Sequence, residues 1–382
     1  MGRRLPLAAY ILVFAIFSSL AACGPGKPAA YAVDVAEARR AESAGRFGEA
    51  VAAWTRARET AKNPRDRAYV GLREAQALAR TGDFAGARAF LLANYPDVNA
   101  PYGAEAKNAA ASYAEKGGDA ATAEREFAAL YRGAPSHGVS RAAFLHVLAA
   151  VEGRNGPEAA ILFLAAEEKT LAGTELEEHV VYERAKRLDQ LGKTADAVAL
   201  YVAVADRFPY PKGAYFDDAL FHAAEIEARS GQGETAVAHL KRLLAVREVS
   251  EFLGTYQRPR FTPALAMLAR LQETALHDRG AAEASWHRLA TDFTTSTLRD
   301  DARFHEARLR HLAGDEGVAC QKLQSLQKDM PDSPWSSCNG ELCPTLAPSS
   351  ATSTNSGDST KAKREVGCRD YVRDTWNTGF HD

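Results

Sequence analysis

Residues 192–201 read GKTADAVALY, and this stretch carries the pattern that decides the fold. Gly192 is a glycine, the residue that most readily adopts the left-handed backbone conformation found just after the end of a helix. Ala197 and Tyr201 stand four positions apart and therefore share one face of the helix that follows. A small residue beside a large one lets a second helix cross closely, while the large side chain fills the groove alongside. The stretch therefore predicts one helix–turn–helix unit.

The same pattern recurs eight times between residues 31 and 331. The small residue recurs as Ala50, Ala87, Ala123, Ala160, Ala197, Ala236, Ala282 and Ala319. The large residue four positions later is Trp54, Leu91, Phe127, Leu164, Tyr201, Leu240, Trp286 or Leu323. The turn position is Gly45, Gly82, Gly118, Asn155, Gly192, Gly231, His277 or Gly314. Without any period-two alternation of strands, the chain is predicted to be all-α, with about eight stacked helix pairs.

A further small position lies twelve residues before each packing alanine. It is alanine in six of the eight units, and Leu148 and Arg270 are the exceptions. A helix that crosses its neighbour closely requires a small side chain there, so this position supports the predicted helix pairs.

Composition limits the classes of function. The chain has 382 residues, with 47 basic against 49 acidic side chains, and 46% of its residues are hydrophobic. This composition is that of a globular protein and not of a disordered one. A near-neutral balance gives no overall field that would attract nucleic acid or an anionic membrane surface, so neither is expected as a partner.

The first residues have the pattern of an export signal. Arg3 and Arg4 precede an apolar run at residues 7–20, and LAAC follows at residues 20–23. The run of about 14 residues is shorter than the roughly 20 that a membrane-spanning helix needs. A signal peptide at residues 1–22 is therefore predicted, with a membrane-spanning anchor and twin-arginine export as weaker alternatives.

The LAAC tetrapeptide resembles the lipobox of bacterial lipoproteins. The resemblance implies that Cys23 is acylated and becomes the first residue of a mature chain, with residues 23–30 as a lipidated tether. Gly24, in place of Asp, implies by the same resemblance the periplasmic face of the outer membrane of a Gram-negative cell. No cofactor is expected apart from this covalent lipid.

The recurring turn, alanine and large apolar positions resemble the tetratricopeptide repeat (TPR). The resemblance implies a right-handed solenoid over residues 31–331. DRFP at residues 206–209 with DDALF at 217–221, echoed by DF at 292–293 and DDARF at 300–304, resembles envelope TPR lipoproteins. Those are of the outer-membrane barrel-assembly or cell-division coordinator type. The resemblance implies a protein–protein interaction scaffold in envelope assembly or division.

The TPR register also implies a binding groove lined by the first helix of each repeat. Such a groove binds a peptide segment or a partner helix, here expected to belong to an envelope protein. The register gives Asn108, His179, Tyr182, Lys186, Asp218, Phe221, Phe304, Arg308 and His311. The alternative is an ordinary solvated inner face with Phe221 and Phe304 packed between repeats.

One unit carries extra sequence at residues 248–263. This insertion combines aromatic and basic side chains, which suit a contact site: Phe252, Tyr256, Arg258 and Arg260. The alternative is a longer connection whose aromatic residues pack under the neighbouring helices.

Residues 332–382 form a predicted C-terminal tail that contains cysteines and is partly flexible. Cys320, Cys338, Cys343 and Cys368 remain once Cys23 is lipidated. In an oxidising compartment they predict two disulfides with three connectivities, and a zinc site is a weaker alternative. Such a staple would hold Tyr371 and Trp376 over the last helix pair.

Catalytic signatures are missing from the sequence. It contains no HExxH, GxSxG or Walker A motif, and GQGETA at residues 231–236 coincides with a repeat turn. We therefore expect no enzyme, no small-molecule substrate and no metal. The predicted function is an anchored interaction scaffold. The alternatives are a pilotin-like accessory lipoprotein for secretion or pili, and a non-catalytic activator of a peptidoglycan enzyme.

Overall fold

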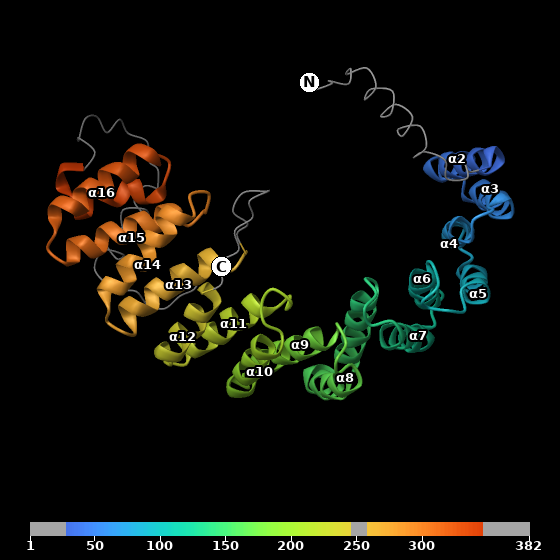
Figure 1. Ribbon diagram of the computed structural model, residues 1–382, viewed down its shortest axis with the longest axis horizontal. Coiled ribbons are helices and arrows are strands. Elements are labelled where there is room, and N and C mark those ends of the chain that lie inside the picture. The colour runs from blue at the N-terminus through green and yellow to red at the C-terminus, as the bar shows by residue number, and fades with distance from the viewer. Residues whose placement is uncertain (1–27, 246–257, 347–382) are drawn as a thin grey trace, which may run out of the picture. The chain divides into compact units, whose positions relative to one another are not determined.

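A computed structural model of the chain describes residues 28–245 and 258–346 (Figure 1). Within these ranges the chain forms α-helices and short 3-10 turns and no strand, which confirms the predicted all-α class. The signal peptide, Cys23, Phe252, Tyr256, Cys368, Tyr371 and Trp376 lie outside the described residues. None of the described helices is both long and apolar enough to cross a membrane.

The chain divides into two compact units, one ending at Glu177 and one starting at Glu178. The first unit holds α2 (Ala29–Ser43), α3 (Phe47–Thr60), α4 (Pro64–Arg80), α5 (Phe84–Asn94), α6 (Gly103–Lys116), α7 (Ala120–Gly133) and α8 (Ser140–Thr170). The second holds α9 (Glu177–Gln190), α10 (Thr194–Arg207), α11 (Phe216–Arg229), α12 (Gly233–Leu244), α13 (Phe261–Thr274), α14 (Arg279–Asp292), α15 (Arg299–Leu312) and α16 (Glu316–Asp329). It ends in η1 (Pro334–Cys338), α17 (Asn339–Leu342) and η2 (Pro344–Leu346).

The helices confirm the predicted register of eight pairs. Every packing alanine is at most 1% exposed, and every large residue four positions later is at most 4% exposed. Both therefore lie at helix crossings, as the i, i+4 spacing requires. Seven pairs consist of two separate helices, and α8 contains both helices of the fourth pair.

The turns follow the predicted positions with one correction. Positive φ angles occur at Gly45, Gly82, Gly118, Gly192, Gly231, Gly314 and His277, as the register predicts. In the fourth pair the prediction of Asn155 is wrong, because Gly156 has the positive φ of 83° and bends α8. Pro157 follows, and a residue before proline avoids the helical region while glycine tolerates positive φ.

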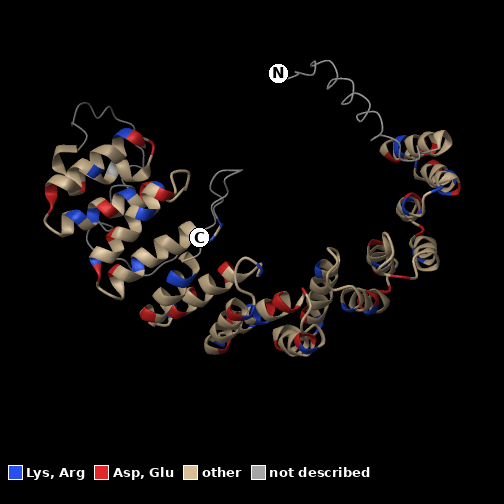
Figure 2. Ribbon diagram, viewed as in Figure 1, with Lys and Arg blue, Asp and Glu red and all other residues tan. Residues whose placement is uncertain are grey.

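Ion pairs join side chains about one repeat apart. In the first unit Arg88 pairs with Glu126, and Arg154 lies 2.5 Å from Glu124. In the second unit Arg242 lies 2.7 Å from Asp206. Acidic and basic residues are interspersed along the helices of both units (Figure 2). These ion pairs add charge contacts to the apolar packing between neighbouring repeats within each unit.

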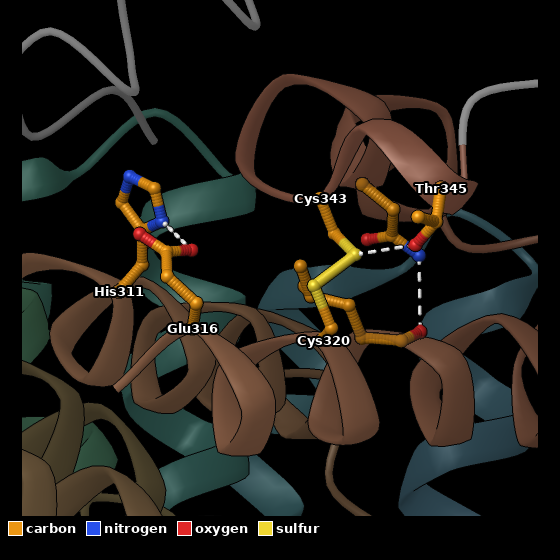
Figure 3. Close-up of a disulfide and its surroundings, with 7 residues drawn as sticks. His311, Glu316, Cys320, Cys343 and Thr345 are labelled. Atoms are coloured by element: carbon orange, nitrogen blue, oxygen red, sulfur yellow. Dashed lines mark hydrogen bonds and ion pairs between the residues drawn. A yellow bond between two sulfur atoms is a disulfide. The ribbon is translucent and has the colours of Figure 1, made fainter. Parts of the chain in front are cut away.

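The last helix pair is covered by residues 334–346. Trp335 stacks on Phe304 with ring centroids 4.5 Å apart, and Leu342 is 1% exposed in the same cluster. A disulfide joins Cys320 of α16 to Cys343 (Figure 3). This pairing selects one of the three predicted connectivities and leaves Cys338 and Cys368. The cover that the structure describes is therefore residues 334–346, which follow α16 directly. The prediction that Tyr371 and Trp376 cover this pair falls outside the described residues.

A pair of glycines in the first repeat tests the turn geometry. Gly45 has a φ of 72° and Gly48 lies in α3, and a methyl group on either would meet no atom within 4 Å. We expect Gly45→Ala to lower the free energy of unfolding by about 1–2 kcal/mol, because alanine is strained at positive φ. Gly48→Ala should raise it by roughly 0.5–1 kcal/mol. Urea unfolding of both variants checks this; equal effects would contradict the turn assignment.

Candidate functional site

Four of the predicted groove residues are buried inside the repeat stack. Tyr182 is 7% exposed, Phe221 6%, Phe304 0% and Arg308 1%. Tyr182 lies parallel to Tyr215 at 4.1 Å, and burial raises the pKa of its hydroxyl. The structure therefore corrects the expectation of an open lining here: these side chains pack between helices, as the alternative held for Phe221 and Phe304.

The other predicted groove residues are partly exposed and mostly held by neighbours. Lys186 lies 3.5 Å from Glu183, and Asp218 lies 2.6 Å from Arg260. His311 lies 2.8 Å from Glu316, as Figure 3 shows. The remaining two are His179, edge-on to Tyr215 at 4.9 Å, and Asn108 on α6. None of these five lines either of the two cavities described below.

The described arginines of the insertion point into the second unit. Arg258 is 5% exposed, pairs with Asp217, and holds its guanidinium 4.0 Å from the ring centroid of Tyr210. Burial lowers the pKa of Arg258. Arg260 lies 5.0 Å from the ring centroid of Phe221. These two residues therefore follow the alternative, a connection that packs against its neighbours, and not an open contact site.

A groove of about 730 Å³ lies in the first unit, and we call it the N-terminal groove. It is formed by the first helices of three successive repeats, α2, α4 and α6, with the turns that follow α2 and α4. Its lining residues include Glu42, Phe47, Arg73, Gln76, Arg80, Phe84, Tyr113 and Lys116. The TPR register of groove-lining positions, which was used above for other repeats, assigns Glu42 in the first repeat and Gln76 in the second to the groove.

The cations of the N-terminal groove lie over aromatic rings. Arg80 holds its guanidinium 5.5 Å from the centroid of Phe47, and Lys116 holds its ammonium 5.9 Å from that of Tyr113. Both cations are exposed to solvent. Arg73 forms an ion pair with Glu42, the one carboxylate in the lining. The groove therefore combines an excess of positive charge with apolar surface.

A second cavity of about 510 Å³ lies in the second unit, between α13, α14 and α15, and we call it the arginine cavity. Its lining comprises Arg270, Glu273, Thr274, His277, Arg279, Trp286, His305 and Arg308. The side chain of Arg308 lies 2.5 Å from Glu273. Arg308 is therefore a lining residue after all, but of this cavity, whose lining also includes the exposed Thr274, His277 and Arg279. Sequence reasoning missed Arg270, although it stood out as an exception among the small positions.

An uncharged histidine forms one wall of the arginine cavity. His305 is 1% exposed and stacks on Trp286 with ring centroids 4.6 Å apart. Burial, with the positive charges of Arg308 and Arg270, lowers the pKa of His305 well below its usual value. The imidazole is therefore neutral near pH 7 and contributes ring surface rather than charge.

Across residues 28–245 and 258–346, no group of three or more His, Cys, Asp or Glu side chains is placed to hold a metal ion.

No protein-family model and no curated protein matches this chain. Several solved structures resemble it, among them TPR proteins and pilus factors. The C-terminal part of a TPR protein from Cytophaga hutchinsonii is 14% identical with a TM-score of 0.40, over 69% of this chain and 97% of that one. PilW, a widely conserved type IV pilus biogenesis factor, is 17% identical with a TM-score of 0.32, over 73% and 98%.

A signal-transduction ATPase with a TPR sensor from Pyrococcus horikoshii is 15% identical, with a TM-score of 0.43 over 84% of this chain and 50% of that one. The TPR-like architecture follows from the buried alanine and large-residue register of the chain's own helix pairs.

The buried His305 predicts a dependence of stability on pH. In the unfolded chain it takes up a proton below about pH 6.5, whereas in the folded chain its lowered pKa keeps it neutral. The free energy of unfolding should therefore fall as the pH drops below 6.5, by up to about 1.4 kcal/mol per pH unit from this group. His305→Asn should remove that component. Urea titrations between neutral and acidic pH measure it, with His311→Asn as the partly exposed control; parallel profiles for all three proteins would contradict it.

Proposed function

We propose that this chain is a non-enzymatic, TPR-like scaffold that binds an acidic segment of a partner protein in the N-terminal groove. In the same proposal, acyl chains on Cys23 hold the scaffold at the periplasmic face of the outer membrane. The observation that carries the binding role is the placement of Arg80 and Lys116 over aromatic faces in a groove of about 730 Å³.

The composition of the groove selects an acidic partner. Its lining holds the cations Arg73, Arg80 and Lys116 against the single carboxylate of Glu42. Since Glu42 already pairs with Arg73, the two exposed cations face solvent with aromatic rings beneath them. Carboxylates of a partner would meet these cations, while its apolar side chains would cover the rings.

The anchor supports the scaffold role through concentration. Two or more acyl chains hold a protein stably at a membrane, whereas a single chain binds marginally. Confinement to a surface raises the effective concentration of the groove for other envelope proteins without adding a contact. The lipobox-like LAAC at residues 20–23 supports this part of the proposal.

Charge reversal at the rim tests the binding role. A photo-crosslinking amino acid in place of Gln76, which lines the groove, should capture a partner in living cells. Adding Arg80→Glu should reduce the captured amount about tenfold, because a carboxylate would then face the partner's carboxylates. Arg125→Glu makes the same change of charge on an exposed residue of α7 outside the lining, and it should leave capture unchanged.

The identity of the crosslinked segment decides the chemistry. An acidic segment supports the proposal, and a basic segment or equal capture by both charge variants contradicts it. A captured envelope-assembly or division protein would favour that pathway, whereas a secretin or pilus component would favour the accessory-factor alternative.

Acylation of Cys23 is tested independently. Cells fed radiolabelled palmitate should label the wild-type protein and not a Cys23→Ala variant, because the thiol that accepts the lipid is absent. The variant should also move from the membrane to the soluble fraction, since the apolar run of about 14 residues is too short to span a bilayer. Cys338→Ala provides the matched control and should keep its label. Label that persists in Cys23→Ala would overturn the anchor.

A further inference from the structure

We propose that the outer face of α2 lies on the surface of the phospholipid bilayer to which the acylated chain is tethered. This inference rests on the acyl anchor at Cys23 proposed above. It goes beyond that anchor, because it assigns a membrane-contacting surface to the folded part of the chain. It is carried by the exposed apolar residues of α2, by the way its charges are paired, and by the length of the tether.

The two faces of α2 differ in their surroundings. Tyr31 and Ala38 are buried and belong to the core of the first helix pairs. The opposite face is apolar and exposed, and its residues are Ala29, Ala32, Val33 and Ala36. Positions 29, 33 and 36 recur at the helical period and therefore lie along one stripe. Val33 is 61% exposed, which places a large apolar side chain in contact with whatever lies next to this helix.

The carboxylates of α2 are all paired with arginines of the following helices. Arg56 of α3 lies 3.1 Å from Asp34 and 2.8 Å from Glu37. Arg73 of α4 pairs with Glu42. These ion pairs offset the negative charges of the helix, so the carboxylates present little repulsion to an anionic surface.

Arg40 gives the outer face of α2 a positive end. It lies one turn after Ala36, is exposed, and donates from Nε to the backbone oxygen of Ala36 at 3.3 Å. Arg39 is exposed beside it and donates to the hydroxyl of Tyr69 at 3.4 Å. Basic side chains next to an exposed apolar face are the combination that holds a helix at an anionic lipid surface. The whole chain is nearly neutral, so this attraction is local to α2.

The short tether keeps the start of α2 close to the bilayer. The helix begins at Ala29, six residues after Cys23. Even a fully extended chain of six residues spans at most about 22 Å. The 15 residues of α2 make a helix that is also about 22 Å long. The start of α2 is thus held within about its own length of the surface, which gives its outer face a high effective concentration for lipid.

Lipid photo-crosslinking tests this contact. The acylated chain would carry a diazirine-bearing amino acid in place of Val33, in vesicles of phosphatidylethanolamine and phosphatidylglycerol. The matched control has the same amino acid in place of Leu162, which is 73% exposed on α8 and is the other exposed large apolar side chain in the described part of the chain. We expect about fivefold more phospholipid adduct from residue 33 than from residue 162, because the former would lie in the headgroup region.

Arg40→Gln tests the contribution of charge. Loss of one basic side chain at an anionic surface should lower the adduct yield from residue 33 by up to about fivefold. Arg125→Gln removes the same charge from an exposed residue of α7 and should leave the yield unchanged. In vesicles of phosphatidylcholine, which carry no net charge, the difference between Arg40→Gln and the unsubstituted chain should disappear. Circular dichroism confirms that both variants are folded.

Vesicle flotation separates this inference from the anchor on which it rests. Protein that floats but gives no more adduct from residue 33 than from residue 162 overturns the contact and leaves the anchor standing. Protein that does not float with the vesicles overturns both. An adduct from residue 33 to a second copy of the chain, in place of lipid, also overturns the contact, because the outer face of α2 would then be an interface between copies.

Discussion

The close crossing of two helices at a buried alanine is the contact on which the rest of this protein depends. Ala197 under Tyr201 is one of eight such crossings, and the alanines are all essentially inaccessible to solvent. A helix pair of this kind has two apolar faces and buries only one internally, so it must stack on a neighbour. The ends of a stack then need a cover. Residues 334–346 supply it at the C-terminal end, where Trp335 lies on Phe304 and a disulfide ties Cys343 to α16.

Much of the fold could be predicted because this contact is local and periodic. The register of small, large and turn residues gave the eight pairs and even the positive φ of His277, a residue that seldom adopts it. The turn at Asn155 was misplaced by one residue, since the restriction that Pro157 places on the preceding residue outweighed the repeat register. Long-range pairing was beyond the pattern: periodicity could not choose Cys320–Cys343 among three connectivities.

The candidate sites were harder to predict than the fold for a physical reason. A repeat register tells which helix face a residue occupies, but not what covers that face. Phe304 has the register of a groove residue and is buried by Trp335, a residue outside the repeats. The N-terminal groove was overlooked because two of its aromatic residues lie outside the first helices of the repeats: Phe47 begins α3 and Phe84 begins α5. A register of the first helices therefore locates a face of the repeats, but not the side chains that reach it from the next helix.

The positively charged side chains discussed for the two cavities differ in their exposure to solvent. This difference affects how strongly they interact with other charges. Arg80 and Lys116 are exposed, so salt screens them and they act mainly on the rate at which an acidic partner arrives. Arg308 is 1% exposed and paired with Glu273, where charges interact more strongly and removal of one partner leaves the other buried. Exposed charges that are screened by salt, like those of the N-terminal groove, suit a large partner that binds reversibly.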